Sequence, residues 1–449
     1  MTASTAPSQQ TPHSRTRAAF ERAKRVLPLG VTSNFRYSGD TTLVIKRGAG
    51  AYVWDMDDRQ YLDFRLAYGP VILGHGHAGV LARITEQLNQ GNLYAHTHPL
   101  EIDVAERIIG MHPAVDKIRY ANSGTEATMH AVRIARAYTN REKIVKFEGA
   151  YHGNHDYALF STANMPANGG GSPRSPIPVP QSSGIPTMAR ELIYITRYNA
   201  FEHVERLVRD KGHEIAALLV EPVMGNAVCL MPEPGYLEHL RKLCDQAGIL
   251  LIFDEVKTGF RVAPGGAGEL FGVKADLTTF AKALGNGFPI AAVGGRDEVM
   301  DTIAMAQVVQ GGTYCGHALG CAAAMGVLDA IEQDHALDVI HDRGQRLKDG
   351  MHDILTEQGI AHEMSGLPSM FGIIFAPRTP KAREFRDVMN GNFQMYTDMA
   401  YALRERGIDV EPDAREPFFL SSAHTVADID NALDRFNDAI KSCKTRWNA

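Results

Sequence analysis

The clearest chemical signal in this sequence is a lysine within the run Phe280-Ala-Lys-Ala-Leu-Gly-Asn-Gly287. Lys282 follows a short apolar segment and precedes a glycine-rich turn. An isolated lysine is usually a solvated charge, but a lysine partly removed from water has a lowered pKa and forms Schiff bases with aldehydes. Lys282 is therefore a candidate for covalent attachment of an aldehyde, if other groups of the chain would hold the same ligand.

An acidic pair, Asp254 and Glu255, closes another apolar segment, Ile249–Phe253. Carboxylates at the strand ends of a doubly wound sheet lie in the crevice where ligands bind. A buried aspartate there would keep a heterocyclic nitrogen protonated, because opposite charges stabilise each other strongly where water is scarce. The alternative is that both acids lie in a surface loop.

A third motif, Asn122-Ser-Gly-Thr-Glu126, follows the apolar segment Ile118–Ala121. Ser123 and Glu126 have the spacing of a capping box, so we expect a helix to begin here. Gly124 would let backbone N–H groups approach a ligand closely, and the helix dipole adds partial positive charge. With the hydroxyl of Thr125, this arrangement predicts a phosphate cradle. Taken alone, it is equally typical of an ordinary capped helix.

The three motifs together point to one cofactor. A phosphate cradle, a carboxylate partner for a ring nitrogen and an amine that binds an aldehyde are the contributions that a protein makes to the chemistry of pyridoxal 5′-phosphate (PLP). We therefore predict a PLP enzyme in which Lys282 holds the cofactor as a Schiff base.

Two other patterns suggest different ligands. Gly74-His-Gly-His-Ala-Gly79 matches a dinucleotide fingerprint, but the apolar run before it is very short and no acidic residue follows at the expected ribose position. His75, His77, His96 and His98 lie in loop-like sequence without carboxylates beside them, so we expect turn or supporting roles and no metal site.

Composition narrows the class of protein. The 449 residues carry a net charge of −6 without a basic block, which disfavours nucleic-acid binding. The apolar runs are far shorter than the roughly 20 residues that span a bilayer, so we expect no membrane partner. The five cysteines form no CxxC pair, and a reducing, cytoplasmic location is the simplest expectation.

The chemical motifs must be positioned by alternating strands and helices. Strands are expected over Ile118–Ala121, Ile144–Phe147, Ala216–Val220, Ile249–Phe253 and Leu277–Phe280. Helices are expected over Ala127–Tyr138 and Tyr236–Ala247, followed by mainly helical sequence beyond Met325 and a βα-like ending around Leu420–Ile440. Such alternation predicts an α/β fold with a mostly parallel sheet. Asn164–Pro186 is rich in Gly, Pro and Ser and reads as a long surface loop or lid.

From about Phe20 to the C-terminus, the chain resembles the class III aminotransferases, and especially their glutamate-1-semialdehyde aminomutase branch. The resemblance rests on the three motifs above and on further runs, which are Lys146-Phe-Glu-Gly-Ala-Tyr-His-Gly153, Glu221-Pro-Val, Asp254-Glu-Val-Lys-Thr-Gly-Phe-Arg261, Gly69-Pro-Val-Ile-Leu-Gly-His75 and Ser422-Ala-His-Thr425.

This resemblance implies a fold-type I architecture and a homodimer with shared active sites. A large PLP domain with a seven-stranded, mostly parallel sheet would span residues 70–330. A smaller α+β domain would combine residues 17–69 with 331–449. Independently of the resemblance, residues 1–16 are rich in Ser, Thr, Pro and Gln, a composition that predicts a disordered tail.

The resemblance also implies residue roles. Lys282 would bind the cofactor and shuttle the proton, and Asp254 would hold the pyridine nitrogen protonated. The remaining positions fall into two groups. Expected against the cofactor are Ser123, Gly124, Thr125, Tyr151, Glu221, Asn226, Val256 and, from the partner subunit, Thr313. Expected against the substrate are Ser33, Arg36, Tyr68 and Glu416. Each also has a plain structural reading as a core, turn, loop or ion-pair residue.

The reaction type is the open question. Arg36 suits a substrate carboxylate, since its guanidinium binds carboxylates in a bidentate manner. Phe35 brings a bulky aromatic next to that site, Tyr68 replaces the usual tryptophan, and Asn164–Pro186 matches the aminomutase gating loop poorly. These departures favour an aminotransferase that moves an amino group from a carboxylate-bearing amino acid to a 2-oxo acid. The alternative is glutamate-1-semialdehyde 2,1-aminomutase, which needs no external acceptor.

Overall fold

The computed structural model describes residues 14–165, 169–304, 308–379 and 381–447. Its main feature is a seven-stranded sheet with the strand order β4-β12-β11-β10-β9-β5-β8. Only β12 runs antiparallel to its two neighbours, β11 and β4. The strands are β4 (Lys117–Ala121), β5 (Lys143–Phe147), β8 (Ile193–Thr196), β9 (Ile215–Val220), β10 (Leu250–Asp254), β11 (Leu277–Phe280) and β12 (Ala291–Gly295).

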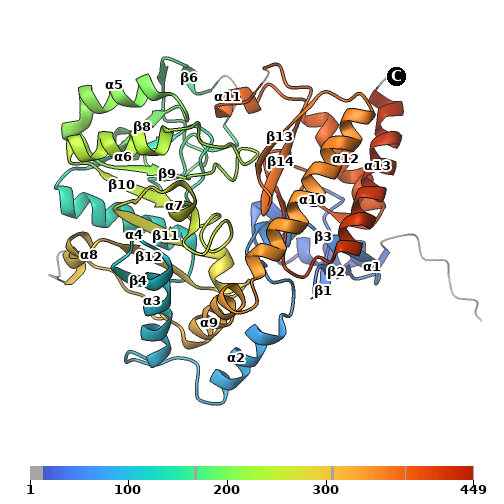
Figure 1. The fold of residues 1–449 in the computed structure, drawn as a ribbon, viewed down its shortest axis with the longest axis horizontal. Helices are drawn as coiled ribbons and strands as arrows, with labels where there is room; N and C mark the ends of the chain where they lie inside the picture. Colours follow the sequence, from blue (N-terminus) through green and yellow to red (C-terminus); the bar gives the residue numbers. More distant parts are fainter. Residues whose placement is uncertain (1–13, 166–168, 305–307, 380, 448–449) are drawn as a thin grey trace, which may run out of the picture.

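Helices cover both faces of this sheet (Figure 1). Alternate residues of β9 show why: Leu218 packs with the apolar stripes of α5 and α6, whereas Leu219 packs with those of α4 and α8. Strands buried on both faces read as continuous apolar runs, as β9 does. The helices of this part of the chain are α2 (Ala78–Leu88), α3 (Pro99–Met111), α4 (Gly124–Thr139), α5 (Phe201–Lys211), α6 (Tyr236–Ala247), α7 (Gly266–Phe271), α8 (Asp297–Ala304) and α9 (Ala318–Glu332).

A smaller α+β unit combines the two ends of the chain, at the right of Figure 1. Strand β15 near the C-terminus pairs in parallel with β3 near the N-terminus, which extends a four-stranded sheet. A three-stranded sheet, β13-β14-β16, lies beside it. The elements are α1 (Ser14–Lys24), β1 (Ile45–Ala49), β2 (Tyr52–Asp55), β3 (Gln60–Asp63), α10 (Ala336–Glu357), β13 (His362–Leu367), β14 (Met370–Phe375), α11 (Phe385–Val388), α12 (Phe393–Glu405), β15 (Ile408–Asp409), β16 (Phe418–Phe419) and α13 (Val426–Trp447).

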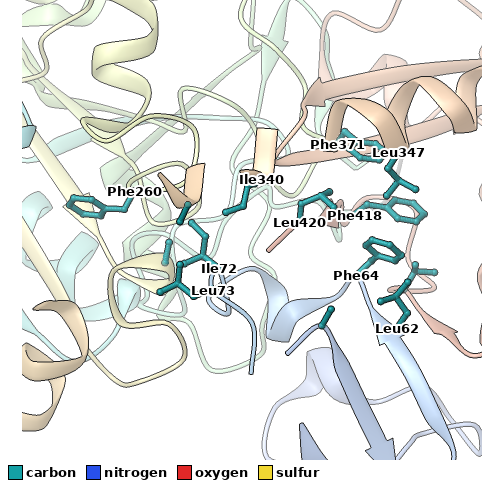
Figure 2. Close-up of a cluster of buried hydrophobic side chains, with 14 of the residues drawn as sticks. Leu62, Phe64, Ile72, Leu73, Phe260, Ile340, Leu347, Phe371, Phe418 and Leu420 are labelled. Atoms are coloured by element: carbon teal, nitrogen blue, oxygen red, sulfur yellow. The ribbon is translucent and has the colours of Figure 1, made fainter. Parts of the chain in front are cut away.

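One continuous cluster of buried side chains joins the two units (Figure 2). Phe64 and Phe418 contribute from the small unit and Phe260 from the large one. Burial of an aromatic side chain contributes roughly 1.5–3 kcal/mol, so this shared core holds the two units together.

The expected strands are confirmed to within a residue or two at each end. The helix expected over Tyr236–Ala247 is confirmed with the same bounds, and the one expected over Ala127–Tyr138 is α4, which begins three residues earlier. Strands β8, β12, β13 and β14 were not expected from the sequence, and the last two interrupt the region predicted to be helical. Within Asn164–Pro186, β6 (Gly171–Ser172) and β7 (Ser175–Pro176) form a small hairpin, and residues 166–168 lie outside the described residues.

The domain limits expected from the sequence, at residues 16/17, 69/70 and 330/331, stay a prediction. Most of the expected tail, residues 1–13, lies outside the described residues, and residues 14–16 begin α1. Helix α9 crosses the proposed limit between residues 330 and 331 and packs against α2 and α3. Among the described helices, none is long and apolar enough to cross a membrane.

Candidate active site

A cavity of about 500 Å³ opens where the parallel strands end. The segments that follow β4, β5, β9, β10 and β11 all reach it, because the carboxyl ends of parallel strands meet at one edge of a sheet. Its wall brings together nine of the residues singled out in the sequence, which are Arg36, Ser123, Gly124, Thr125, Tyr151, Glu221, Asn226, Asp254 and Val256, and it also contains Lys282.

Lys282 begins a short 3₁₀ helix, Lys282–Gly285, directly after β11. Its backbone adopts a φ of 45°, in the left-handed region that residues other than glycine rarely occupy. Burial, together with the positive charge of Lys257, lowers the pKa of the Lys282 amine to about 7, although the carboxylates of Glu416, Glu221 and Asp254 oppose the shift. An amine with such a pKa is substantially neutral near pH 7 and therefore nucleophilic.

Asp254 is held at the floor of the cavity by three donors. His152 Nδ1 lies 2.6 Å from one carboxylate oxygen, and the other oxygen accepts hydrogen bonds from the Thr279 hydroxyl and the Val256 N–H, each at 3.1 Å. Only 4% of Asp254 is exposed. A carboxylate fixed in this way would pair well with a protonated ring nitrogen.

The start of α4 forms another part of the cavity wall. Ser123 caps the helix by accepting a hydrogen bond from Glu126 N–H at 3.2 Å, as predicted, while the Glu126 carboxylate accepts from Asn122 N–H at 2.6 Å. A Cβ at Gly124 would lie 2.9 Å from both methyl carbons of Val256, so only glycine fits here without displacement. Free N–H groups at a helix N-terminus, with adjacent hydroxyls, suit a phosphate.

Tyr151 and Glu221 are linked at the cavity wall. The Glu221 carboxylate accepts hydrogen bonds from Tyr151 N–H at 2.9 Å and from Gly225 N–H at 3.0 Å. Burial raises the pKa of the Glu221 carboxyl, and it also raises the pKa of the Tyr151 phenol to about 12, with help from the Asp254 and Glu416 charges. Tyr151 therefore stays protonated and presents a neutral aromatic ring.

The predicted substrate residues divide between two cavities. Arg36 lines the main cavity and donates to the Thr32 hydroxyl at 2.9 Å. Tyr68 and Glu416 line a second cavity of about 270 Å³, which shares Tyr151 and Asn226 with the main one. Ser33 is among the lining residues of neither.

Thr313 is exposed and does not line the main cavity. Its expected role depends on a partner subunit, so that role remains a prediction. The histidines near the start of the chain take part in local structure: His77 and His98 cap α2 and α3, and His75 contacts Asp63 at 2.8 Å.

Two ionisable residues of the cavity wall, His152 and Lys257, have no role assigned from the sequence. His152, the partner of Asp254, follows Tyr151 directly in the Lys146–Gly153 run, so that run carried the signal. Lys257 lies next to Val256 in the Asp254–Arg261 run and pairs with Glu416, whose contact with it could not be read from the sequence.

Comparison with known proteins gives one consistent family. The model of the family described as aminotransferase class-III matches residues 35–440. The chain is 39% identical to a glutamate-1-semialdehyde 2,1-aminomutase from Methanothrix thermoacetophila, over 95% of this chain and 96% of that protein. It is 40% identical to a protein of the same name from Thermus thermophilus, over 94% of this chain and 98% of that one.

Solved structures with the same fold include transaminases. An omega-transaminase from Sphaerobacter thermophilus superposes with a TM-score of 0.89 at 30% identity, covering 98% of this chain and all of that one. A transaminase solved with PLP bound has a TM-score of 0.86 at 26% identity, covering 96% of this chain and 98% of that one. The architecture is therefore that of fold-type I PLP enzymes.

The donor set of the main cavity fits this cofactor. The amine of Lys282 suits the aldehyde, the carboxylate of Asp254 suits the ring nitrogen, and the start of α4 suits the phosphate. The side-chain oxygen of Asn226, buried and without a hydrogen-bond partner among the described residues, is available to a ring substituent. PLP is the cofactor, and the chain belongs to the class III aminotransferase family.

Proposed function

We propose that this protein is a glutamate-1-semialdehyde 2,1-aminomutase, or acts on a close analogue of that substrate. The observation that carries the proposal is the similarity to aminomutases of this name at 37–40% identity over 94–95% of the chain. This ranks the two activities in the reverse order to the sequence prediction, which had favoured a transaminase.

The cavity suits a compact substrate with a carboxylate. When bound, PLP supplies an aldehyde that accepts an amino group and a ring that stabilises negative charge at the reacting carbon. Arg36, on the cavity wall, would bind the substrate carboxylate in a bidentate manner and so orient the molecule toward Lys282.

Each side chain then has a defined task. The Lys282 amine, with its lowered pKa, would take a proton from one carbon and return it to another. Asp254 would keep the ring nitrogen protonated, and Ser123, Gly124 and Thr125 would bind the phosphate. Tyr151 and Val256 would hold the ring between them, with Glu221 and Asn226 at its edge.

A specific observation favours a second candidate, an aminotransferase with an external 2-oxo acid as acceptor. The ring of Phe35 lies edge-on to Tyr151 with centroids 5.6 Å apart and to Tyr68 at 6.3 Å. These rings border the second cavity and would contact a larger, aromatic side chain of an amino donor. The omega-transaminase with the same fold agrees with this reading.

A product assay separates the two candidates. The purified holoenzyme is incubated with glutamate 1-semialdehyde alone, and 5-aminolevulinate is measured. We expect conversion without a second substrate, because an aminomutase moves the amino group between two carbons of one molecule with no net redox change. Lys282→Ala should abolish both the conversion and the visible absorption band of the bound cofactor.

The opposite outcome is equally clear. If the semialdehyde is not converted, and an amino acid bleaches the visible band that a 2-oxo acid then restores, the aminomutase proposal is wrong and the transaminase proposal stands. A panel of α- and β-amino acids, with and without aromatic side chains, then identifies the donor.

We also propose a homodimer, with Thr313 reaching the phosphate of the partner's site.

A further inference from the structure

A buried ion pair in the wall of the main cavity has no part in the function proposed above. Lys257 Nζ lies 2.9 Å from one carboxylate oxygen of Glu416 and donates a second hydrogen bond to the Gly225 carbonyl at 3.0 Å. The side chains are 6% and 11% exposed. Lys257 lines the same cavity as Lys282, while Glu416 lines the adjoining one.

The surrounding structure fixes the pair in place. The second carboxylate oxygen of Glu416 accepts a hydrogen bond from the Asn226 amide. The stem of Lys257 packs so closely against Gly225 that a Cβ there would lie 2.2 Å from Lys257 Cδ. The ring of Phe419 lies 5.7 Å from Lys257 Nζ. Neither side chain is free to swing out to solvent, so both charges act at fixed positions.

These charges act on Lys282. The charged groups that face its amine are the cation of Lys257 and the carboxylates of Glu416, Glu221 and Asp254. Lys257 disfavours a proton on Lys282, whereas Glu416 favours one. Glu416 is in turn faced by the phenol of Tyr151 and by the carboxylate of Glu411.

The charge of Glu411 is balanced by Arg65, with which it forms an ion pair. Asp254 and Glu221 already have their own roles at the ring nitrogen and the cavity wall. Glu416 is expected on the substrate side, but its pairing with Lys257 is the part of the charge environment of Lys282 that no role given above explains.

We propose that Lys257 is a positioning residue which, together with Glu416, sets how readily the nitrogen of Lys282 takes up a proton in the loaded enzyme. Because the pair carries one charge of each sign, its two members act on Lys282 in opposite directions, and each offsets the other. The inference rests on the proposed attachment of PLP at Lys282 and holds for either reaction considered above.

The test is the pH dependence of the visible absorption of the holoenzyme. Lys257→Gln removes a positive charge near Lys282. The pH at the midpoint of the absorption change should therefore rise, by roughly one unit for a charge at short range in a protein interior. Glu416→Gln removes a negative charge and should lower the midpoint. The double variant K257Q/E416Q removes both charges and should return the midpoint toward that of the unaltered enzyme.

Lys257→Met serves as a second variant, since methionine has a similar length and would pack on Phe419. Lys143→Gln is the matched control. Lys143 also pairs with a glutamate, Glu214, at 2.7 Å, but it begins β5 and so lies at the opposite edge of the sheet. The absorption midpoint of the Lys143→Gln enzyme should equal that of the unaltered enzyme.

If the two single variants leave the midpoint unchanged, or move it in the same direction, the pair is only a structural contact and the inference is overturned. Failure of the underlying attachment is recognised separately: a visible band with its pH dependence intact in Lys282→Ala would show that the cofactor is held elsewhere.

Discussion

At the scale of single residues, the adjacent acids Asp254 and Glu255 face different surroundings. Asp254 reaches the cavity, with His152 against it. Glu255 is fully buried and accepts hydrogen bonds from the Ala267 and Gly268 N–H groups at the start of α7. Successive side chains at a strand end point in opposite directions, so one acid serves the cavity and the other stabilises the fold.

This difference predicts two distinct phenotypes. Asp254→Asn should lower the rate of amino-group transfer at saturating substrate by roughly 100-fold or more, since an amide carries no charge to hold a ring nitrogen protonated. Single-turnover absorbance measurements, normalised to bound cofactor, would check this. Glu255→Gln should instead lower the unfolding midpoint and leave the normalised rate close to that of the unaltered enzyme. Equal rates for Asp254→Asn and the unaltered enzyme would contradict the role of Asp254.

Sequence reasoning reached Lys282, Asp254 and the Ser123–Thr125 turn because each lies in a short motif whose local chemistry is legible. It missed the Lys257–Glu416 pair because the two residues are 159 positions apart, and their contact depends on how the C-terminal part of the chain packs against the large unit. Thr313 lies outside the cavity of this chain, so its role depends on the partner subunit.

At the scale of elements, the first turn of α4 brings the proposed phosphate site next to Val256, the residue proposed to contact the cofactor ring. Gly124 lies between the capping hydroxyl of Ser123 and the side chain of Val256. Thr125 is held from the other side, where its hydroxyl accepts a hydrogen bond from Asn154 N–H at 3.2 Å. Gly153 packs so closely against Thr125 that a Cβ at Gly153 would lie 2.6 Å from the Thr125 hydroxyl oxygen. The helix start is therefore fixed from two directions.

Gly124→Ala should weaken the binding of PLP. The added methyl would lie 2.9 Å from both methyl carbons of Val256, so either the helix start or Val256 must shift. Overpacking of this kind costs about 1–3 kcal/mol, which corresponds to binding weaker by roughly 5- to 150-fold. Equilibrium dialysis of the cofactor would measure it. Gly110→Ala in α3, where an added Cβ meets nothing within 4 Å, is the control.

The elements also show where pattern reading succeeds and where it fails. Short apolar runs predicted β5, β9, β10 and β11 well. Strand β12 escaped because it is made of small residues, and its glycines are required: a Cβ at Gly295 would lie 2.4 Å from the Asp276 carbonyl oxygen. Close packing of the backbone thus leaves Val293 as the only β-branched residue of β12, and β-branched residues are those by which strands are usually recognised.

At the scale of the whole molecule, a buried arginine links the large unit to the small one. Arg261 donates to the carbonyls of Ser369 and Leu420 at 3.2 Å each, and it also bonds the Gly69 carbonyl. Its guanidinium lies 5.2 Å from the ring of Phe419. The main cavity is lined by Arg36 from the N-terminal part of the chain and by strand-end residues of the large unit, so these contacts hold the site together.

His424 joins the two ends of the chain within the small unit. It is 1% exposed, its ring stacks on Phe64 with centroids 4.8 Å apart, and its Nδ1 accepts a hydrogen bond from Ser421 N–H at 3.1 Å. Burial lowers the pKa of His424 to about 4, against opposing contributions from the Ser421 backbone and the Asp63 and Asp428 charges. The folded protein therefore holds this imidazole neutral well below the usual pKa of histidine.

This shift makes the stability of the protein depend on pH. Between about pH 6.5 and pH 4 the unfolded chain binds a proton at His424 that the folded chain cannot bind, so the free energy of unfolding falls as the pH falls through that window, by up to about 3 kcal/mol from this residue. His155, whose pKa is also lowered to about 4, contributes in the same direction. The contribution of His424 must therefore be measured as a difference between variants.

His424→Asn supplies that difference, because the amide oxygen of asparagine can accept the Ser421 hydrogen bond without titrating. Denaturant unfolding at pH 7 and at pH 4.5 should show a smaller loss of stability in His424→Asn than in the unaltered protein. The control is His213→Asn, since the His213 side chain is 76% exposed and should leave the pH dependence unchanged. If His424→Asn loses as much stability as the unaltered protein between the two pH values, His424 is not the buried neutral histidine described here, and the junction between the chain ends does not confer acid sensitivity.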